Sequence, residues 1–177
     1  MELRNLDGYT FGESQDCILY GATLELTPYG SYVYSFNLPL YDDFESIHLA
    51  FSERTFVRGS DGALDQRISG NKFDLTPHIK AAFLRSTTAA FLAHFGAMSA
   101  CLDKRVIRCI AVAMYRHHMI PESLHLLGRI RESDRFVDSQ FVSGANTLED
   151  HISHSRFSEA DALVERWIDR GRSMLLP

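Results

Sequence analysis

The chain has 177 residues, 45% of them hydrophobic and 23% charged, which excludes wholesale disorder and fits a globular protein with a buried core. The sequence does not open with a secretory signal, and its longest run without Lys, Arg, Asp or Glu, residues 86–102, is too polar for a membrane span; we therefore expect neither a signal peptide nor a membrane segment. Three cysteines without a Cys-x-x-Cys pair predict reduced thiols in a cytoplasmic protein, not a disulfide framework or a cysteine-type zinc site.

Charge is unevenly distributed along the chain. The formal net charge is −5, yet residues 1–53 carry nine acidic residues and a single basic one, Arg4. Residues 54–177 carry 17 basic and 14 acidic residues. A division of this kind bears on partners and association rather than on the fold.

The first 75 residues are predicted to be mainly β-structure, because apolar and polar side chains alternate with a period of two. The first two strands are separated by a Thr-Pro-Tyr-Gly-Ser turn and should form a hairpin. In the second strand we expect Tyr32, Tyr34 and Phe36 to face the helices. The predicted strands are residues 17–26, residues 32–38, residues 46–52, a short strand from Arg54, and residues 66–75.

The remainder of the chain, residues 76–177, is predicted to be mainly helical. Thr76 and Pro77 suit the start of a helix, Asp103 can cap the next one, and Pro121 must interrupt that one because it lacks an N–H group. The predicted helices run from Pro77 to Gly96 or Leu102, from Lys104 to the Pro121 break, over residues 122–131, and from Ser158 to Gly171. A late strand that ends at Gly144 is predicted before the last helix.

Strands followed by helices are typical of the α+β class. We predict one α+β domain over residues 1–177, mainly β in residues 1–75 and mainly α in residues 76–177. Its antiparallel sheet would contain four to five strands in a meander, and about four helices would pack on one face of that sheet.

Tyrosines are concentrated in the acidic third of the chain, where six of the seven occur within residues 1–41. Tyrosine is enriched at interface cores because it is large, rigid and amphipathic. Acidic side chains beside tyrosines would attract a basic partner and speed the encounter. The stretch 38–46 combines both features, and Tyr29 also lies in a turn. The candidate partner-binding residues are Tyr29, Tyr41, Asp42, Asp43, Phe44 and Glu45.

A second candidate site lies in residues 146–157. His151 and His154 are three residues apart, so a helical turn would place both on one face, where Glu149 or Asp150 could orient an imidazole. With a third ligand from another helix, such a site would suit hydrolysis by a metal-activated water. We favour the alternative, a polar junction between a strand and the last helix. The candidate ligands of the metal site are His151, His154, His117, His118 and His125.

The helices of residues 104–135 have a basic character, since residues 103–135 hold seven basic and four acidic side chains. A helix-turn-helix that binds nucleic acid is one interpretation, but the turn at Pro121 lacks the usual glycine. A net charge of −5 also opposes the approach to a polyanion. We therefore expect these arginines to decorate the solvent faces of core helices.

A small-molecule cavity between sheet and helices is a further interpretation, because a curved sheet covered by helices often holds such a pocket. No sequence feature names a ligand for it. Its expected lining is Tyr20, Tyr34, Phe36, Phe83 and Phe91.

The leading hypothesis is a non-catalytic, protein-binding regulator, such as an inhibitor, an immunity-type protein or a chaperone-like module. It would engage a basic protein partner through an acidic, tyrosine-bearing surface. No cofactor is expected, and self-association is left open. The first alternative is a histidine-dependent, metal-assisted hydrolase, and the second is a nucleic-acid-binding regulator that uses residues 104–135.

Overall fold

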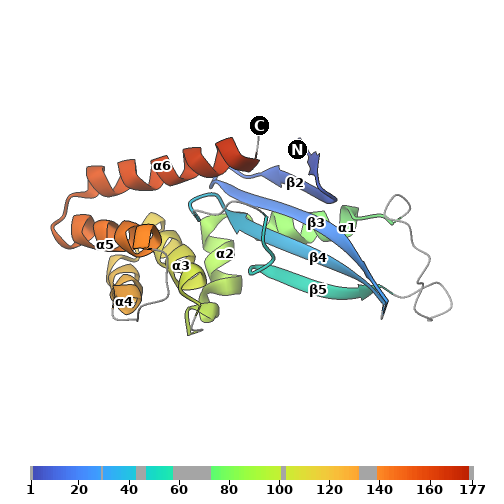
Figure 1. Cartoon of the computed structure of the whole chain (residues 1–177), viewed down its shortest axis with the longest axis horizontal. Helices are drawn as coiled ribbons and strands as arrows, with labels where there is room; N and C mark the ends of the chain where they lie inside the picture. Colours follow the sequence, from blue (N-terminus) through green and yellow to red (C-terminus); the bar gives the residue numbers. More distant parts are fainter. Residues whose placement is uncertain are drawn as a thin grey trace. The chain divides into compact units, whose positions relative to one another are not determined.

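Five antiparallel strands form one sheet in the order β1-β2-β3-β4-β5 (Figure 1). This count refers to the residues that the computed structural model describes, namely 2–28, 30–42, 47–57, 73–100, 103–131 and 139–175. Strand order equal to chain order is a meander. The strands are β1 (Arg4–Leu6), β2 (Tyr9–Glu13), β3 (Ile18–Thr27), β4 (Gly30–Pro39) and β5 (Ser52–Val57).

Helices follow the sheet, so the prediction of an α+β fold with an N-terminal antiparallel meander is confirmed. No helix in the described ranges is both long and apolar enough to cross a membrane. The helices are α1 (Thr76–Leu84), α2 (Thr88–Phe95), the 3₁₀ helix η1 (Gly96–Ala100), α3 (Lys104–Arg116), α4 (Ile120–Arg131), α5 (Ser139–Ser153) and α6 (Phe157–Leu175).

The chain divides into two compact units. The sheet unit comprises residues up to Leu38 together with His48–Ala90, and therefore holds α1 and the five strands except Pro39, the last residue of β4. The helical unit comprises Pro39–Ile47 and the chain from Phe91 onward. A single domain over residues 1–177 stays a prediction.

Helix α1 packs on one face of the sheet and forms a small apolar core with it. On β4 this core includes Val33, and the Asn37 side chain on the same face donates a hydrogen bond to the Ala82 carbonyl of α1. Because side chains alternate along a strand, Tyr32 and Tyr34 point to the opposite face. The prediction that Tyr32 and Tyr34 face the helices is therefore wrong with respect to α1, which covers the other face of the sheet. The core consists of Tyr20, Ala22, Val33, Val57, Ile79 and Ala82.

The same alternation separates the residues expected to line a cavity. Tyr20 packs against Phe83 of α1, with ring centroids 5.1 Å apart. Phe36 packs against Tyr9, with ring centroids 5.8 Å apart, on the face that carries Tyr34. The cavity interpretation is therefore wrong for this residue set, because its members lie on both faces of the sheet.

The strand expected over residues 46–52 is absent from its described part. Residues 47–51 are irregular and β5 begins only at Ser52. Local hydrogen bonds compete with strand pairing here, because the Ala50 N–H donates to the His48 imidazole and the Ser52 hydroxyl donates to the Leu49 carbonyl. Strands β1 and β2 were not predicted. The strand expected over 66–75 lies largely outside the described residues, and its last three residues are not in a strand.

The long helix expected from Pro77 is divided into α1 and α2. Arg85 ends α1 by donating its N–H to the Ala82 and Phe83 carbonyls. The Asp16 carboxylate, from the turn between β2 and β3, accepts a hydrogen bond from the Thr88 N–H at the start of α2. An acceptor from a distant part of the chain thus satisfies the new helix end, which local sequence patterns could not reveal.

Helix α3 begins as predicted, since Asp103 is its N-cap and accepts hydrogen bonds from the N–H groups of Arg105 and Val106. Helix α4 begins at Ile120, directly before Pro121, which is tolerated in a first helical turn. The chain therefore turns between α3 and α4 where the proline predicted a break.

The late strand predicted to end at Gly144 is wrong for its described part, because Ser139–Ser153 is helix α5. Ala145, Leu148 and Ile152 are buried at helical spacing. Helix α6 also continues past Gly171, its predicted end, to Leu175. The buried side of α5 packs against α4 and α6, and burial of this kind can override a local strand pattern.

Candidate functional site

Two of the expected partner-binding residues, Tyr41 and Asp42, are buried, with 0% and 1% of their surface exposed. Asp42 Oδ1 lies 3.2 Å from Arg108 Nη2, and both side chains belong to the helical unit. The expectation that Tyr41 and Asp42 form an exposed surface is therefore wrong, since an ion pair holds this segment inside. The remaining expected residues, Tyr29, Asp43, Phe44 and Glu45, lie outside the described part of the chain.

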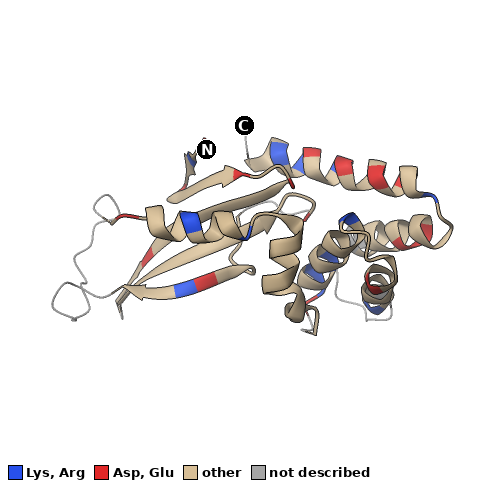
Figure 2. Cartoon of the chain, turned by 180° about the vertical axis from the view of Figure 1, so that it is seen from behind, with Lys and Arg blue, Asp and Glu red and all other residues tan. Residues whose placement is uncertain are grey.

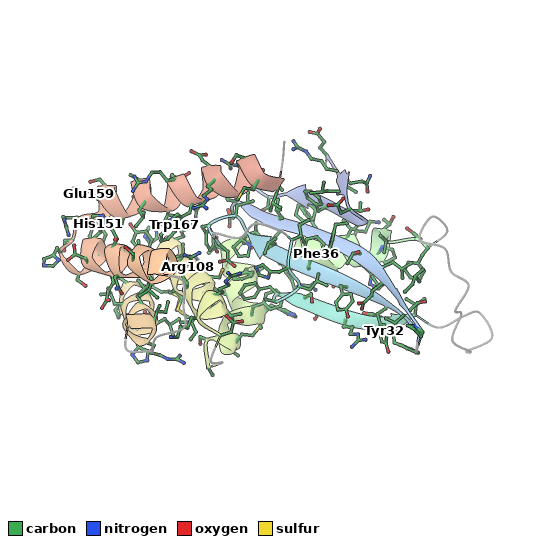
Figure 3. All side chains as sticks on the ribbon, viewed as in Figure 1. Tyr32, Phe36, Arg108, His151, Glu159 and Trp167 are labelled. Carbon is green, nitrogen blue, oxygen red and sulfur yellow. The ribbon has the colours of Figure 1, made fainter. Side chains whose placement is uncertain are left out.

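Arg108 was expected on a solvent face of α3, and that expectation is wrong as well. It is 1% exposed, and its guanidinium carbon lies 5.1 Å from the centre of the Trp167 ring of α6 (Figure 3). Its neighbour Cys109 is completely buried, and this desolvation raises the pKa of the thiol well above its usual range. Asp42, Arg108 and Trp167 therefore belong to the buried interior of the helical unit.

The histidines of residues 146–157 lie at the end of a helix and not at the expected strand junction. His151 is inside α5, and His154 follows its last residue with Nδ1 at 3.1 Å from Asp150 Oδ1. His117 and His118 follow α3, and His125 is exposed on α4. Among the described residues, no three His, Cys, Asp or Glu side chains lie close enough to hold a metal ion.

The basic residues of 104–135 are divided among different environments. Arg108 is buried, Arg116 pairs with Glu165 at 3.4 Å, and Arg129 donates a hydrogen bond to the Ser99 carbonyl. The side chains of Arg131 and Arg135 lie outside the described set. Figure 2 shows acidic residues close to basic ones, above all along α6.

Two partly exposed tyrosines lie on the sheet face opposite α1. Tyr32 and Tyr34 of β4 are half-buried there, and Phe56 of β5 is 38% exposed. Tyr32 pairs with Phe56 across the two strands, with ring centroids 5.1 Å apart in an edge-to-face arrangement. We call this surface, with Tyr9 further along it, the tyrosine face. Phe36, which Tyr9 contacts edge-to-face, is buried (Figure 3).

Two charged side chains, Arg54 and Glu25, contact the tyrosines of the tyrosine face. The Arg54 guanidinium lies 3.6 Å from the centre of the Tyr32 ring and 5.7 Å from that of Tyr34. The Tyr34 hydroxyl donates a hydrogen bond of 2.8 Å to Glu25, and this bond is the main reason why the pKa of the phenol is raised. Strand β5 is an edge of the described sheet. The sequence indicated the tyrosines but not Arg54 or Phe56, because the face they share depends on register.

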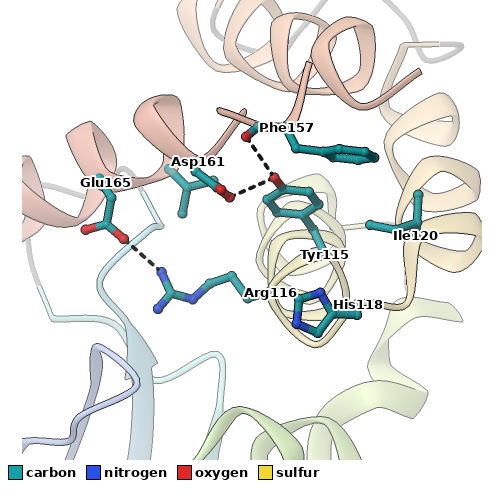
Figure 4. Close-up of a pocket in the computed structure, with 8 residues that line it drawn as sticks. Tyr115, Arg116, His118, Ile120, Phe157, Asp161 and Glu165 are labelled. Carbon is teal, nitrogen blue, oxygen red and sulfur yellow. Dashed lines mark hydrogen bonds and ion pairs between the residues drawn. The ribbon is translucent and has the colours of Figure 1, made fainter. Parts of the chain in front are cut away.

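A cavity of about 500 Å³ lies in the helical unit between the end of α3 and the first turns of α4 and α6 (Figure 4). Burial and a 2.7 Å hydrogen bond to Asp161 raise the pKa of the Tyr115 phenol, which therefore stays a donor at neutral pH. We call this cavity the helical pocket. Its lining is Tyr115, Arg116, His118, Ile120, Phe157, Asp161, Val164 and Glu165.

His118, at the rim of the helical pocket, holds a left-handed backbone conformation, with φ of 61°. The turn after α3 is a Schellman motif, because the His118 N–H donates to the Tyr115 carbonyl and the Met119 N–H donates to the Met114 carbonyl. Glycine is the usual residue at such a position. Strain in a pocket residue is a feature found at functional sites.

Replacing His118 by glycine is expected to stabilise the protein, by about 1 kcal/mol, because it removes the left-handed strain. Thermal unfolding would measure the gain. Ser155→Gly is the matched control, since Ser155 lies in the turn after α5 in the same conformation, with φ of 57°, outside the pocket. A loss of stability in His118→Gly alone would show that the imidazole makes a stabilising contact that exceeds the strain.

Comparisons with protein-family models, with curated proteins and with solved structures found no match to this chain. Function must therefore be inferred from the geometry of the chain itself. Two features stand out in the described residues: the tyrosine face of the sheet unit and the helical pocket.

Proposed function

We propose that this chain is a non-catalytic protein-binding regulator that engages its partner through the tyrosine face. The observation that carries the proposal is the row of half-buried and exposed aromatic rings on the sheet face opposite α1. Aromatic rings with polar edges are the side chains most often found at the energetic centre of protein interfaces. Such a surface would suit an inhibitor, an immunity-type protein or a chaperone-like module.

The edge position of β5 supports the same proposal. Glu53, Arg54, Thr55 and Phe56 are all exposed, and within the described sheet β5 pairs with β4 alone. An extended partner segment could add to this edge through backbone hydrogen bonds and place its side chains over the rings beside it. The same residues discourage uncontrolled pairing, because charged side chains on an edge strand oppose aggregation.

A basic partner suits the chemistry of this face. Glu25 is exposed beside Tyr34, and the Arg54 guanidinium over Tyr32 is an internal example of a cation held on one of these rings. A lysine or arginine of the partner would find the same kind of ring and a nearby carboxylate. The buried thiols of Cys17 and Cys109 accord with a reducing compartment, and we propose the cytoplasm.

Site-specific photocrosslinking tests the proposal. With p-benzoylphenylalanine at position 56, irradiation in the native cell is expected to yield an adduct with one defined protein. The matched control carries the same group at Leu84 on α1, an apolar residue that is 75% exposed away from the tyrosine face. Equal adducts from both positions, or none from position 56, would contradict the proposal.

Binding measurements with the purified partner then test which residues of the tyrosine face contribute to affinity. Phe56→Ser and Tyr32→Ser are expected to weaken binding about tenfold or more, because each removes a ring from the centre of the interface. Glu25→Gln should slow association mainly at low salt, since an exposed charge acts on the encounter. Leu84→Ser should bind like the unaltered protein. An unchanged affinity in both ring variants would refute the role of the tyrosine face.

A further inference from the structure

We propose that the helical pocket binds a small organic cation, namely an ammonium or amidinium group joined to an apolar or aromatic group. The proposal concerns a second site, in the helical unit, and does not rest on the proposed function of the tyrosine face. The volume of the helical pocket, about 500 Å³, lies in the range of pockets that hold small ligands.

The charges of the lining favour a cation. Two carboxylates, Asp161 and Glu165, line the pocket beside one guanidinium, that of Arg116. Arg116 pairs with Glu165 at 3.4 Å, whereas the described partner of Asp161 is the uncharged Tyr115 hydroxyl. The ion pair thus leaves the negative charge of Asp161 uncompensated by a described cation, and a cationic ligand would balance it.

The Tyr115 phenol fixes where that charge lies. It donates to Asp161 Oδ1 at 2.7 Å and also to the Phe157 carbonyl at 3.3 Å, so one hydrogen bonds to two acceptors from the N-terminal part of α6 (Figure 4). Because Tyr115 belongs to α3, this bond ties the pocket wall of α6 to the end of α3. The carboxylate is therefore held in place before any ligand arrives, which lowers the entropic cost of binding.

The apolar residues of the lining would contact the apolar or aromatic group of the ligand. Phe157 is 44% exposed although it is large and apolar, and Ile120 and Val164 line the same cavity. Figure 4 shows the Phe157 ring beside Tyr115 and Ile120. A ligand with a ring or alkyl group would cover these surfaces. An inorganic anion is disfavoured, because it would meet two carboxylates and would have to compete with Glu165 for Arg116.

Calorimetric titration with phenethylammonium tests the inference. We expect saturable one-to-one binding in the millimolar range or tighter, with binding weaker by about tenfold or more for 2-phenylethanol and phenylacetate, which keep the ring but lack the cation. Equal binding of the neutral alcohol, preferred binding of the anion, or no saturable binding of phenethylammonium would overturn the inference.

Variants locate the binding site. Asp161→Asn is expected to reduce phenethylammonium affinity about tenfold or more, while Asp169→Asn, on the same helix and outside the pocket, should leave it unchanged. Phe157→Ser removes the apolar wall and keeps both carboxylates, so it should weaken binding even if Asp161→Asn fails to fold. Circular dichroism checks the fold of each variant. Full affinity in a folded Asp161→Asn or Phe157→Ser protein would overturn the proposed site.

Discussion

Replacing Arg108 by alanine is expected to lower the free energy of unfolding by about 3–5 kcal/mol, one of the largest effects of any single substitution in this chain. The variant removes the guanidinium 3.2 Å from the Asp42 carboxylate, and both side chains are 1% exposed. A buried carboxylate that loses its cation must either stay charged at a high desolvation cost or bind a proton. Urea denaturation at neutral pH measures the loss.

Two controls distinguish the effect of the buried pair Asp42 and Arg108 from that of an exposed ion pair. In the double variant Asp42→Leu with Arg108→Met, much of the stability should return, because no charge is left inside. Arg172→Ala should cost at most about 1 kcal/mol, since the Arg172 and Asp169 pair of α6 is largely exposed. If Arg108→Ala costs no more than Arg172→Ala, the buried Asp42 carboxylate does not depend on Arg108.

Alanine at Gly171 is expected to destabilise the protein by about 1–3 kcal/mol or more, the usual range for overpacking a core. A Cβ at this position would lie 2.5 Å from the Leu40 carbonyl oxygen, which is main chain and cannot rotate away. In an open helix interior the same substitution would stabilise, because alanine is the better helix former by about 1 kcal/mol. The sign of the effect therefore measures the close packing of α6 on the Leu40 backbone.

Gly128→Ala is the matched control for this experiment. Gly128 also lies within a helix, α4, but its nearest neighbour to a new Cβ is the Glu149 carboxylate at 3.9 Å, an ordinary contact. Thermal melts should show a higher midpoint for Gly128→Ala and a lower one for Gly171→Ala. A higher midpoint in both variants would mean that α6 can move away from Leu40 without cost.

The α+β class and several of its elements could be predicted from local sequence patterns. Alternation over residues 17–26 and 32–38 identified the central hairpin, which the structure forms as β3 and β4. Asp103 and Pro121 located the start of α3 and the turn before α4. These signals are short-range, because alternation, capping and the missing proline N–H each act within a few residues. They hold where tertiary packing agrees with them, and the helix at residues 139–153 shows that packing can override them.

The orientation of β4 could not be predicted from its sequence. Apolar side chains occupy both faces of the strand, so either face could have been covered by a helix. The structure places α1 over the face that carries Tyr20, Ala22 and Val33, and it leaves Tyr32 and Tyr34 on the other face. The helix contributes Ile79 and Ala82 to this core, so the covered face depends on how side chains of separate elements fit together.

The candidate site shows the same limit. The tyrosines were predicted to matter, but Tyr41 and Asp42 seemed exposed only because an isolated turn is usually on the surface. The helical pocket had no sequence signal at all. Its central bond joins Tyr115 to Asp161, which are 46 residues apart, and no local periodicity links such positions.

The sequence by itself determined the order and type of most elements, the hairpin, the α3 cap and the uneven charge of the chain. The tertiary structure decided which sheet face is covered, which charges are buried, and where α5 replaces an expected strand. The physical reason is the range of the forces involved. Backbone preferences act between neighbours, whereas burial of the pair Asp42 and Arg108, 66 residues apart, depends on how whole elements pack.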